Sequence, residues 1–216
     1  NMDIKIRRAR NDDVPFLGWV MYTAARSHLE TCPWNQILDE ADQGTRTLLE
    51  HVSQSANAHW CHVSKFWIAE ADGRPAAALC GFTPATEGTA ILAEAALGVA
   101  ATELEYSEKK LAGIGERLVV AMSGLPEDLP DVWGVENVAV LPEYRGKGLI
   151  DRLFDHVLDE GREHGFKRVQ ILCLIGNERA ERAWVRNGFE VLTQQTSQEF
   201  EQLIGTQGTK LLARDL

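Results

Sequence analysis

Residues 142–150 read P-E-Y-R-G-K-G-L-I, and they join an apolar run at 135–141 to an amphipathic run that follows. The apolar run is typical of a buried strand, and the amphipathic run has the spacing of a helix. A helix that starts directly after a glycine turn leaves unpaired backbone N–H groups in its first turn, where they can bind an anion. Gly146 and Gly148 permit positive φ and a close approach of a ligand, because they lack a Cβ atom. The stretch therefore predicts a site for a phosphate or pyrophosphate group.

The charges and spacing of this loop narrow the kind of nucleotide site. Arg145 and Lys147 add two positive charges beside the glycines. The loop lacks the G-x-x-x-x-G-K-S/T pattern of a P-loop. It also lacks the third glycine of a dinucleotide fingerprint, because Asp151 stands at that position. A plain helix N-terminal turn is the alternative, so the interpretation depends on the sequence downstream.

A second strand and a second helix follow in order. Residues 168–175 are apolar and predict a strand, and residues 178–186 have helical spacing. Asn187 and Gly188 then mark a helix end, since both residue types favour the left-handed conformation found there. The interval 133–192 thus predicts a strand–loop–helix–strand–helix–strand unit.

Two motifs of this unit resemble those of the GCN5-related N-acetyltransferase (GNAT) family. The loop motif of the family is Q/R-x-x-G-x-G/A, which Arg145 and Gly148 match, whereas Ile150 replaces the last small residue. The later motif is N-x-x-A-x-x-x-Y-x-x-x-G-F, and Trp184 stands at its tyrosine position. The positions of the later motif that match are Asn177, Ala180, Gly188 and Phe189.

The resemblance implies an α/β fold, with a mixed, twisted sheet of about seven strands flanked by helices (the acyl-CoA N-acyltransferase fold). It also implies a single domain over residues 2–216. The patterns upstream and downstream of the motifs agree with this fold, including a hairpin signal at Asp72-Gly73. The elements expected from the patterns are strands at 4–9, 66–70, 76–82 and 209–214, a helix through Ala24 and a helix at 39–52.

Residues 84–130 depart from the family pattern, in which a short connection joins the third and fourth strands. Two helical patterns occur in this interval, at about 90–105 and 108–122. We interpret the interval as a helical insertion beside the acceptor side of the site, serving as a lid, a dimer surface or packing against the sheet. The apolar residues expected on one face of the second helix are Leu111, Ile114, Leu118 and Val119.

Composition limits the classes of partner. The 216-residue chain has a formal net charge of −10, which argues against a nucleic-acid surface. The negative charge suits a cationic ligand such as an amine, and solubility alone is the alternative explanation. No apolar run reaches the ~18 residues that a membrane helix needs. The four cysteines have no framework spacing, which favours reduced thiols in the cytoplasm. We expect a cytoplasmic protein that acts on a small-molecule amine, without nucleic acid or membrane, and we leave monomer and homodimer open.

By the same resemblance, acetyl-CoA is the cosubstrate and no metal is required. Family members part their fourth strand from their fifth, and the pantetheine arm lies in the opening. Carried over to this chain, the residues that bind the cosubstrate are Val138, Ala139, Val140, Arg145, Gly146, Lys147, Gly148, Leu149, Ile150 and Asn177. Asn177 also suits a helix N-cap, and the two roles are compatible. Ile150 either crowds the pyrophosphate or packs into the helix.

Acetyl transfer to an amine needs a base that removes a proton. Glu136, on the expected fourth strand, is the first candidate, acting directly or through water, and a glutamate on a solvated strand end is the alternative. Asp131 and His28 are further candidates. The general acid stays unassigned, because Trp184 stands where the family has tyrosine and an indole N–H cannot deliver a proton.

Other groups have ordinary explanations. Cys173, on the expected fifth strand, is better explained as a small buried residue than as a nucleophile. Residues 59–62 read H-W-C-H and offer three metal ligands, but no second cluster supplies a fourth. The tryptophans of the acceptor half either line a pocket for an apolar or aromatic amine or pack in the core, and they are Trp19, Trp34 and Trp60.

The resulting prediction is transfer of an acetyl group from acetyl-CoA to a primary amine, by direct attack in a ternary complex. A covalent acyl-enzyme is disfavoured because the sequence offers no activated nucleophile. Two alternatives stay open. One is a non-catalytic acetyl-CoA-binding or sensing module, which the departures at Ile150 and Trp184 would suit. The other is a protein N-acetyltransferase that modifies an N-terminus or a lysine.

Overall fold

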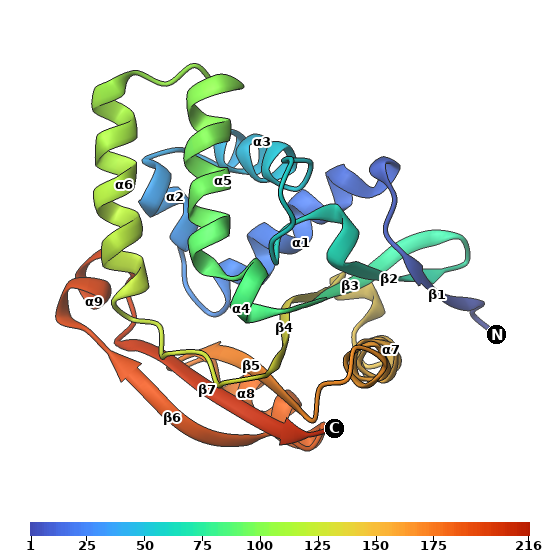
Figure 1. Cartoon of the computed structure of the whole chain (residues 1–216). Helices are drawn as coiled ribbons and strands as arrows, with labels where there is room; N and C mark the ends of the chain where they lie inside the picture. Colours follow the sequence, from blue (N-terminus) through green and yellow to red (C-terminus); the bar gives the residue numbers. More distant parts are fainter.

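The computed structural model describes residues 1–216 and is built on one seven-stranded sheet with the strand order β1-β2-β3-β4-β5-β7-β6 (Figure 1). Neighbouring strands are antiparallel except β4 and β5, which run parallel. This mixed sheet confirms the fold expected from the sequence. The strands are β1 (Ile4–Arg8), β2 (Phe66–Ala71), β3 (Arg74–Phe82), β4 (Trp133–Val140), β5 (Arg168–Leu174), β6 (Glu190–Thr196) and β7 (Gly208–Asp215).

Helices cover both faces of the sheet, and each face has its own hydrophobic core. The helices α1 to α6 gather on one side, and α7 lies on the other (Figure 1). Their bounds are α1 (Val14–Arg26), α2 (Pro33–Leu38), α3 (Asp42–Val52), α4 (Pro84–Glu87), α5 (Thr89–Thr102), α6 (Glu108–Met122), α7 (Leu149–Glu163), α8 (Glu178–Arg186) and α9 (Gln198–Ile204). We call the core beneath α1, α2, α3, α5, α6 and α9 the first core, and the core beneath α7 and α8 the second core. No helix has the length and apolar character that crossing a membrane requires.

The helices between β3 and β4 are present as expected, as α5 and α6, and the short α4 precedes them. Two details of the helical predictions are wrong. Val119 is 64% exposed and does not share the buried face of α6, where Ile114 and Leu118 pack into the first core. The helix expected at 39–52 begins three residues later, as α3, because Asp39 has φ of +52° and ends the preceding α2 in the left-handed conformation.

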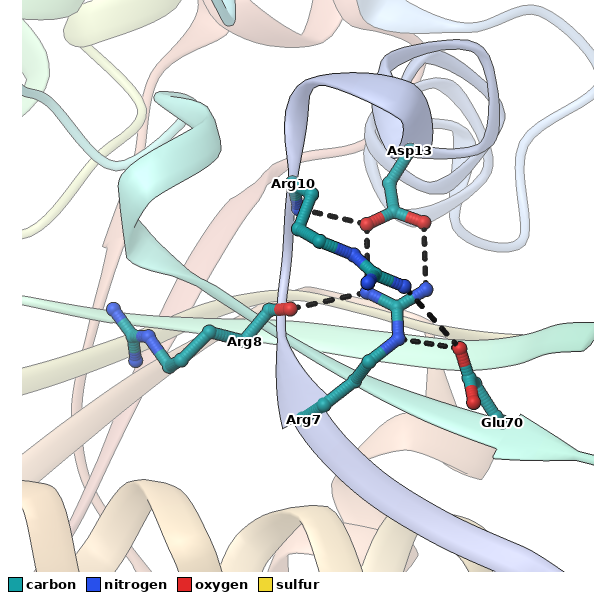
Figure 2. Close-up of polar contacts among 5 residues, drawn as sticks. All are labelled: Arg7, Arg8, Arg10, Asp13 and Glu70. Carbon is teal, nitrogen blue, oxygen red and sulfur yellow. Dashed lines mark hydrogen bonds and ion pairs between the residues drawn. The ribbon is translucent and has the colours of Figure 1, made fainter. Parts of the chain in front are cut away.

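An ion-pair network fixes the start of α1 against the sheet edge (Figure 2). The Arg7 guanidinium of β1 donates to both carboxylate oxygens of Asp13, at 2.7 and 2.9 Å, and also to Glu70 of β2. The Arg10 amide donates to Asp13 at 2.7 Å. Burial raises the pKa of Asp13, but the hydrogen bonds from Arg7 and Arg10 outweigh burial and hold that pKa below its ordinary value. The network therefore stabilises the ionised carboxylate.

Candidate active site

The site begins where two central strands part. β4 and β5 pair over three residue pairs, from Trp133 with Val169 to Val135 with Ile171. Beyond these pairs β4 continues beside β3 alone and β5 beside β7 alone. A cavity of about 770 Å³ lies at this fork, lined by β4 and β5 and by residues of α1, α2, α5, α6, α7, α8 and α9. Its size is within the usual range for small-molecule sites.

A bulge in β4 sets which residues reach the cavity. Asn137 has φ of +55°, and the pairing with β3 shifts by one residue at this point. The side chain of Asn137 holds this conformation, because its Nδ2 donates to the Trp60 carbonyl at 2.8 Å. After the bulge, Ala139 belongs to the first core, while Val138 and Val140 pack against the second. All three line the cavity, as the resemblance predicts.

The importance of Asn137 was not predicted from the sequence. The available signal was an asparagine inside an otherwise apolar strand, and asparagine tolerates positive φ better than most residues. Because the bulge depends on a carbonyl more than 70 residues away in the chain, local sequence alone does not predict it.

Glu136 lies at the point where the strands separate. Its Oε1 accepts a hydrogen bond from the Leu172 amide at 3.1 Å, the first β5 amide beyond the paired region. The half-buried side chain lines the cavity and does not lie on an open solvated face. Burial raises the pKa of Glu136 to about 8, the Leu172 hydrogen bond opposes that rise, and the negative charge of Asp128 adds to it. The carboxyl group therefore holds its proton to a higher pH than an ordinary glutamate does.

The glycine loop has the backbone conformation that the sequence predicts. Gly146 and Gly148 have φ of +72° and +76°, and Gly148 caps α7. A Cβ atom on either residue would meet nothing within 4 Å, so these positions need glycine for its conformation rather than for space. The loop residues that line the cavity are Arg145, Gly146, Gly148, Leu149 and Ile150. Lys147 is exposed and does not line it.

The start of α8 contributes two further predicted residues. Asn177 caps the helix, because its side-chain oxygen accepts a hydrogen bond from the Ala180 amide at 3.2 Å. Asn177 also lines the cavity, so the N-cap residue lies where a ligand could contact it. Its Nδ2 donates to the Ser27 hydroxyl of the segment after α1. Trp184 lines the cavity and is 8% exposed, and its indole N–H is buried without a hydrogen-bond partner. Ile150 lines the cavity and also packs against the second core.

The structure brings some of the other candidates to the cavity and leaves others outside it. Asp131 and His28 are exposed and do not line it. Cys173 lines it, but burial raises the pKa of this thiol to about 11, so the thiol is neutral at ordinary pH. Trp34 and Trp60 line the cavity and Trp19 does not.

The histidines of residues 59–62 form hydrogen bonds within the protein. Nδ1 of His59 accepts from the Cys61 amide at 3.0 Å, and Nε2 lies 2.8 Å from the Ser55 hydroxyl. Burial, aided by the nearby His62, lowers the pKa of His59 to about 4. No group of three or more His, Cys, Asp or Glu side chains is placed to hold a metal ion.

Solved structures share the fold at low sequence identity. An acetyltransferase structure is 16% identical, covers 98% of both chains and has a TM-score of 0.69. An N-acetyltransferase from Staphylococcus aureus Mu50 is 18% identical over 97% of this chain and 100% of that one, with a TM-score of 0.65. N-acetylglutamate synthase from Neisseria gonorrhoeae, solved with coenzyme A and L-arginine, is 16% identical over 100% of this chain and 34% of that one, with a TM-score of 0.51.

No curated protein matches the sequence. The acetyltransferase (GNAT) family matches it over residues 34–189, which include the fork, the glycine loop and α8. This match covers more than half of the chain, and the chain belongs to the GNAT family of acetyltransferases.

Proposed function

We infer that this protein transfers the acetyl group of acetyl-CoA to a primary amine by direct attack in a ternary complex. The observation that carries the proposal is one continuous cavity, which joins the positive-φ glycine loop before α7 to the Glu136 carboxyl at the β4–β5 fork. Membership of an acetyltransferase family supports the reaction class. The coenzyme A bound to the structurally similar N-acetylglutamate synthase supports the choice of cosubstrate.

The cosubstrate would occupy the side of the cavity beneath α7 and α8. Backbone N–H groups at the start of α7 suit its pyrophosphate, and the guanidinium groups of Arg145 and α8 add positive charge there. Exposed Lys147 contributes charge from the outer edge of the loop. The pantetheine arm would lie along Val138–Val140 and beside Asn177. The thioester would then face Glu136.

The chemical step forms one bond and breaks another. The amine nitrogen attacks the thioester carbon, the C–N bond forms, the C–S bond breaks, and coenzyme A leaves as a thiolate. Glu136 accepts the proton that the amine loses, directly or through water, and its raised pKa makes it a stronger base than an ordinary carboxylate. The unpartnered indole N–H of Trp184 can donate a hydrogen bond to a ligand, and the proton for the thiolate comes from water.

The neutral Cys173 thiol favours direct attack over an acyl-enzyme, because a nucleophilic cysteine needs a lowered pKa. A non-catalytic acetyl-CoA-binding module is the second candidate, favoured by Ile150 in the wall of the cavity and by a tryptophan at the tyrosine position. Acetylation of a protein N-terminus or lysine is a third. We also propose that residues 2–216 form one domain, in which the insertion 84–130 supplies one wall of the acceptor side.

Two measurements test the proposal. Acetyl-CoA at ~100 times its dissociation constant should add about 2.7 kcal/mol to the free energy of unfolding and raise the melting temperature by roughly 5–10 °C. Release of free thiol on addition of an amine should then follow at a rate proportional to enzyme. A melting temperature unchanged at millimolar acetyl-CoA would refute cosubstrate binding. Binding without amine-dependent thiol release, from any small amine or peptide, would identify the non-catalytic module instead.

A further inference from the structure

We propose that the acceptor is a hydrophobic primary monoamine, with one ammonium group on an apolar aliphatic or aromatic body. The inference rests on the proposed function and specifies its substrate class. It comes from the distribution of charge in the wall of the cavity.

Apart from Glu136, the charged side chains in the wall lie on one side of the cavity. Arg145 and Asp151 belong to the glycine loop and the start of α7, and the remaining arginines of the wall belong to α8. Across the fork, on the side of the first core, Glu136 is the single ionisable side chain that lines the cavity. An acceptor that enters from this side therefore meets one carboxyl group.

The rest of the acceptor side is apolar. It is formed by helices far apart in sequence, which surround the space in front of Glu136, and the large side chains are Trp34, Ile37, Leu92, Leu118, Phe200 and Ile204. The remaining polar side chains there are neutral and include the hydroxyls of Thr23, Ser27, Thr89 and Thr209. Thr209 is 2% exposed and its hydroxyl has no partner. This wall suits an apolar body that forms at most a few hydrogen bonds.

The wall also disfavours other kinds of amine. An amino acid would place its carboxylate where no lysine or arginine can pair with it, and burial of an unpaired charge is unfavourable. A diamine or a guanidino amine would carry a second cation, and the acceptor side has no second acidic group to receive it, since Asp151 lies across the fork at the start of α7. A monoamine avoids both penalties, and the apolar surroundings lower the pKa of its ammonium, which favours the neutral nucleophile.

A panel of amines tests this inference by thiol release at saturating acetyl-CoA. The panel is 2-phenylethylamine and hexylamine against 1,4-diaminobutane, agmatine and L-glutamate. We expect kcat/KM for the first two to exceed that of the others by at least ~100-fold. Preference for a diamine, agmatine or the amino acid would overturn the inference while acetyl transfer stands. No thiol release from any amine, with acetyl-CoA still raising the melting temperature, would overturn the proposed function and the inference with it.

A pair of matched variants tests whether the apolar wall causes the preference for a monoamine. Ala121→Asp adds a carboxylate to the part of α6 that lines the cavity, whereas Val119→Asp adds one two residues away on the exposed surface. Ala121→Asp should lower the ratio of kcat/KM for 2-phenylethylamine over 1,4-diaminobutane at least ~10-fold, and Val119→Asp should leave it unchanged. Ala93→Asp, from α5, repeats the test if Ala121→Asp does not fold. An unchanged ratio in a folded cavity variant would overturn the inference.

Discussion

At the scale of single residues, the proposed chemistry depends on Glu136, whose pKa burial raises to about 8. If Glu136 is the base, kcat at saturating amine should rise with pH up to about 8 and then level off, because the carboxylate is the active form and ionisation of the free amine does not affect kcat. Glu136→Gln removes the base while its side-chain oxygen can still accept from the Leu172 amide. We expect this variant to lose ~100-fold or more in kcat/KM and to lose the rise with pH, as measured by thiol release.

Asp131→Asn is the matched control, since Asp131 was the second candidate base and lies exposed outside the cavity. It should retain activity and the same pH profile. A large loss in Asp131→Asn, or an unchanged profile in Glu136→Gln, would contradict the assignment of the base.

At the scale of elements, the turn between β4 and α7 depends on the backbone conformation of Gly148. Gly148→Ala places a Cβ atom on a residue with φ of +76°, which should cost about 1–2 kcal/mol of unfolding free energy. Because the strained turn would move the α7 amides, we also expect the dissociation constant of acetyl-CoA to rise about 10-fold. Chemical denaturation and calorimetric titration measure the two effects.

Gly98→Ala is the control for Gly148→Ala. Gly98 lies in the exposed part of α5, with helical backbone and open space around a Cβ atom. Alanine there should stabilise the protein by about 0.5–1 kcal/mol and leave acetyl-CoA binding unchanged. Equal acetyl-CoA affinity in the two variants would show that the conformation of Gly148 does not matter for binding.

At the scale of the whole molecule, the Arg7–Asp13–Glu70 network joins α1 to β1 and β2 (Figure 2). Because the pKa of Asp13 is lower in the folded than in the unfolded state, its contribution to stability is present above the unfolded pKa and is lost as pH falls through the folded pKa. Asp13→Asn should cost about 2–3 kcal/mol at pH 7, and less as the pH falls below the unfolded value. Urea denaturation at a series of pH values measures this, with the exposed Asp12→Asn expected within about 0.5 kcal/mol of the parent.

The strand–loop–helix units around residues 142–150 and 176–186 were predicted closely, because glycine conformation, helix caps and apolar periodicity act between near neighbours. The errors concern the buried face of one helix and the start of another. Val119 is apolar yet faces solvent, since burial on a helix depends on what packs against it, and Asp39, expected to begin a helix, is the left-handed residue that ends α2.

The sequence by itself determined the family, the order of most elements, the conformation of the glycine loop and the cavity residues of that loop, since these depend on short motifs. Only the tertiary structure decided how the residues work together. The fork brings Glu136 to the Leu172 amide, a carbonyl from Trp60 holds the bulge at Asn137, and five separate helices complete the apolar wall. The pKa of Glu136 and the charge of the acceptor side follow from which groups surround them in space, and those groups come from segments far apart in the chain.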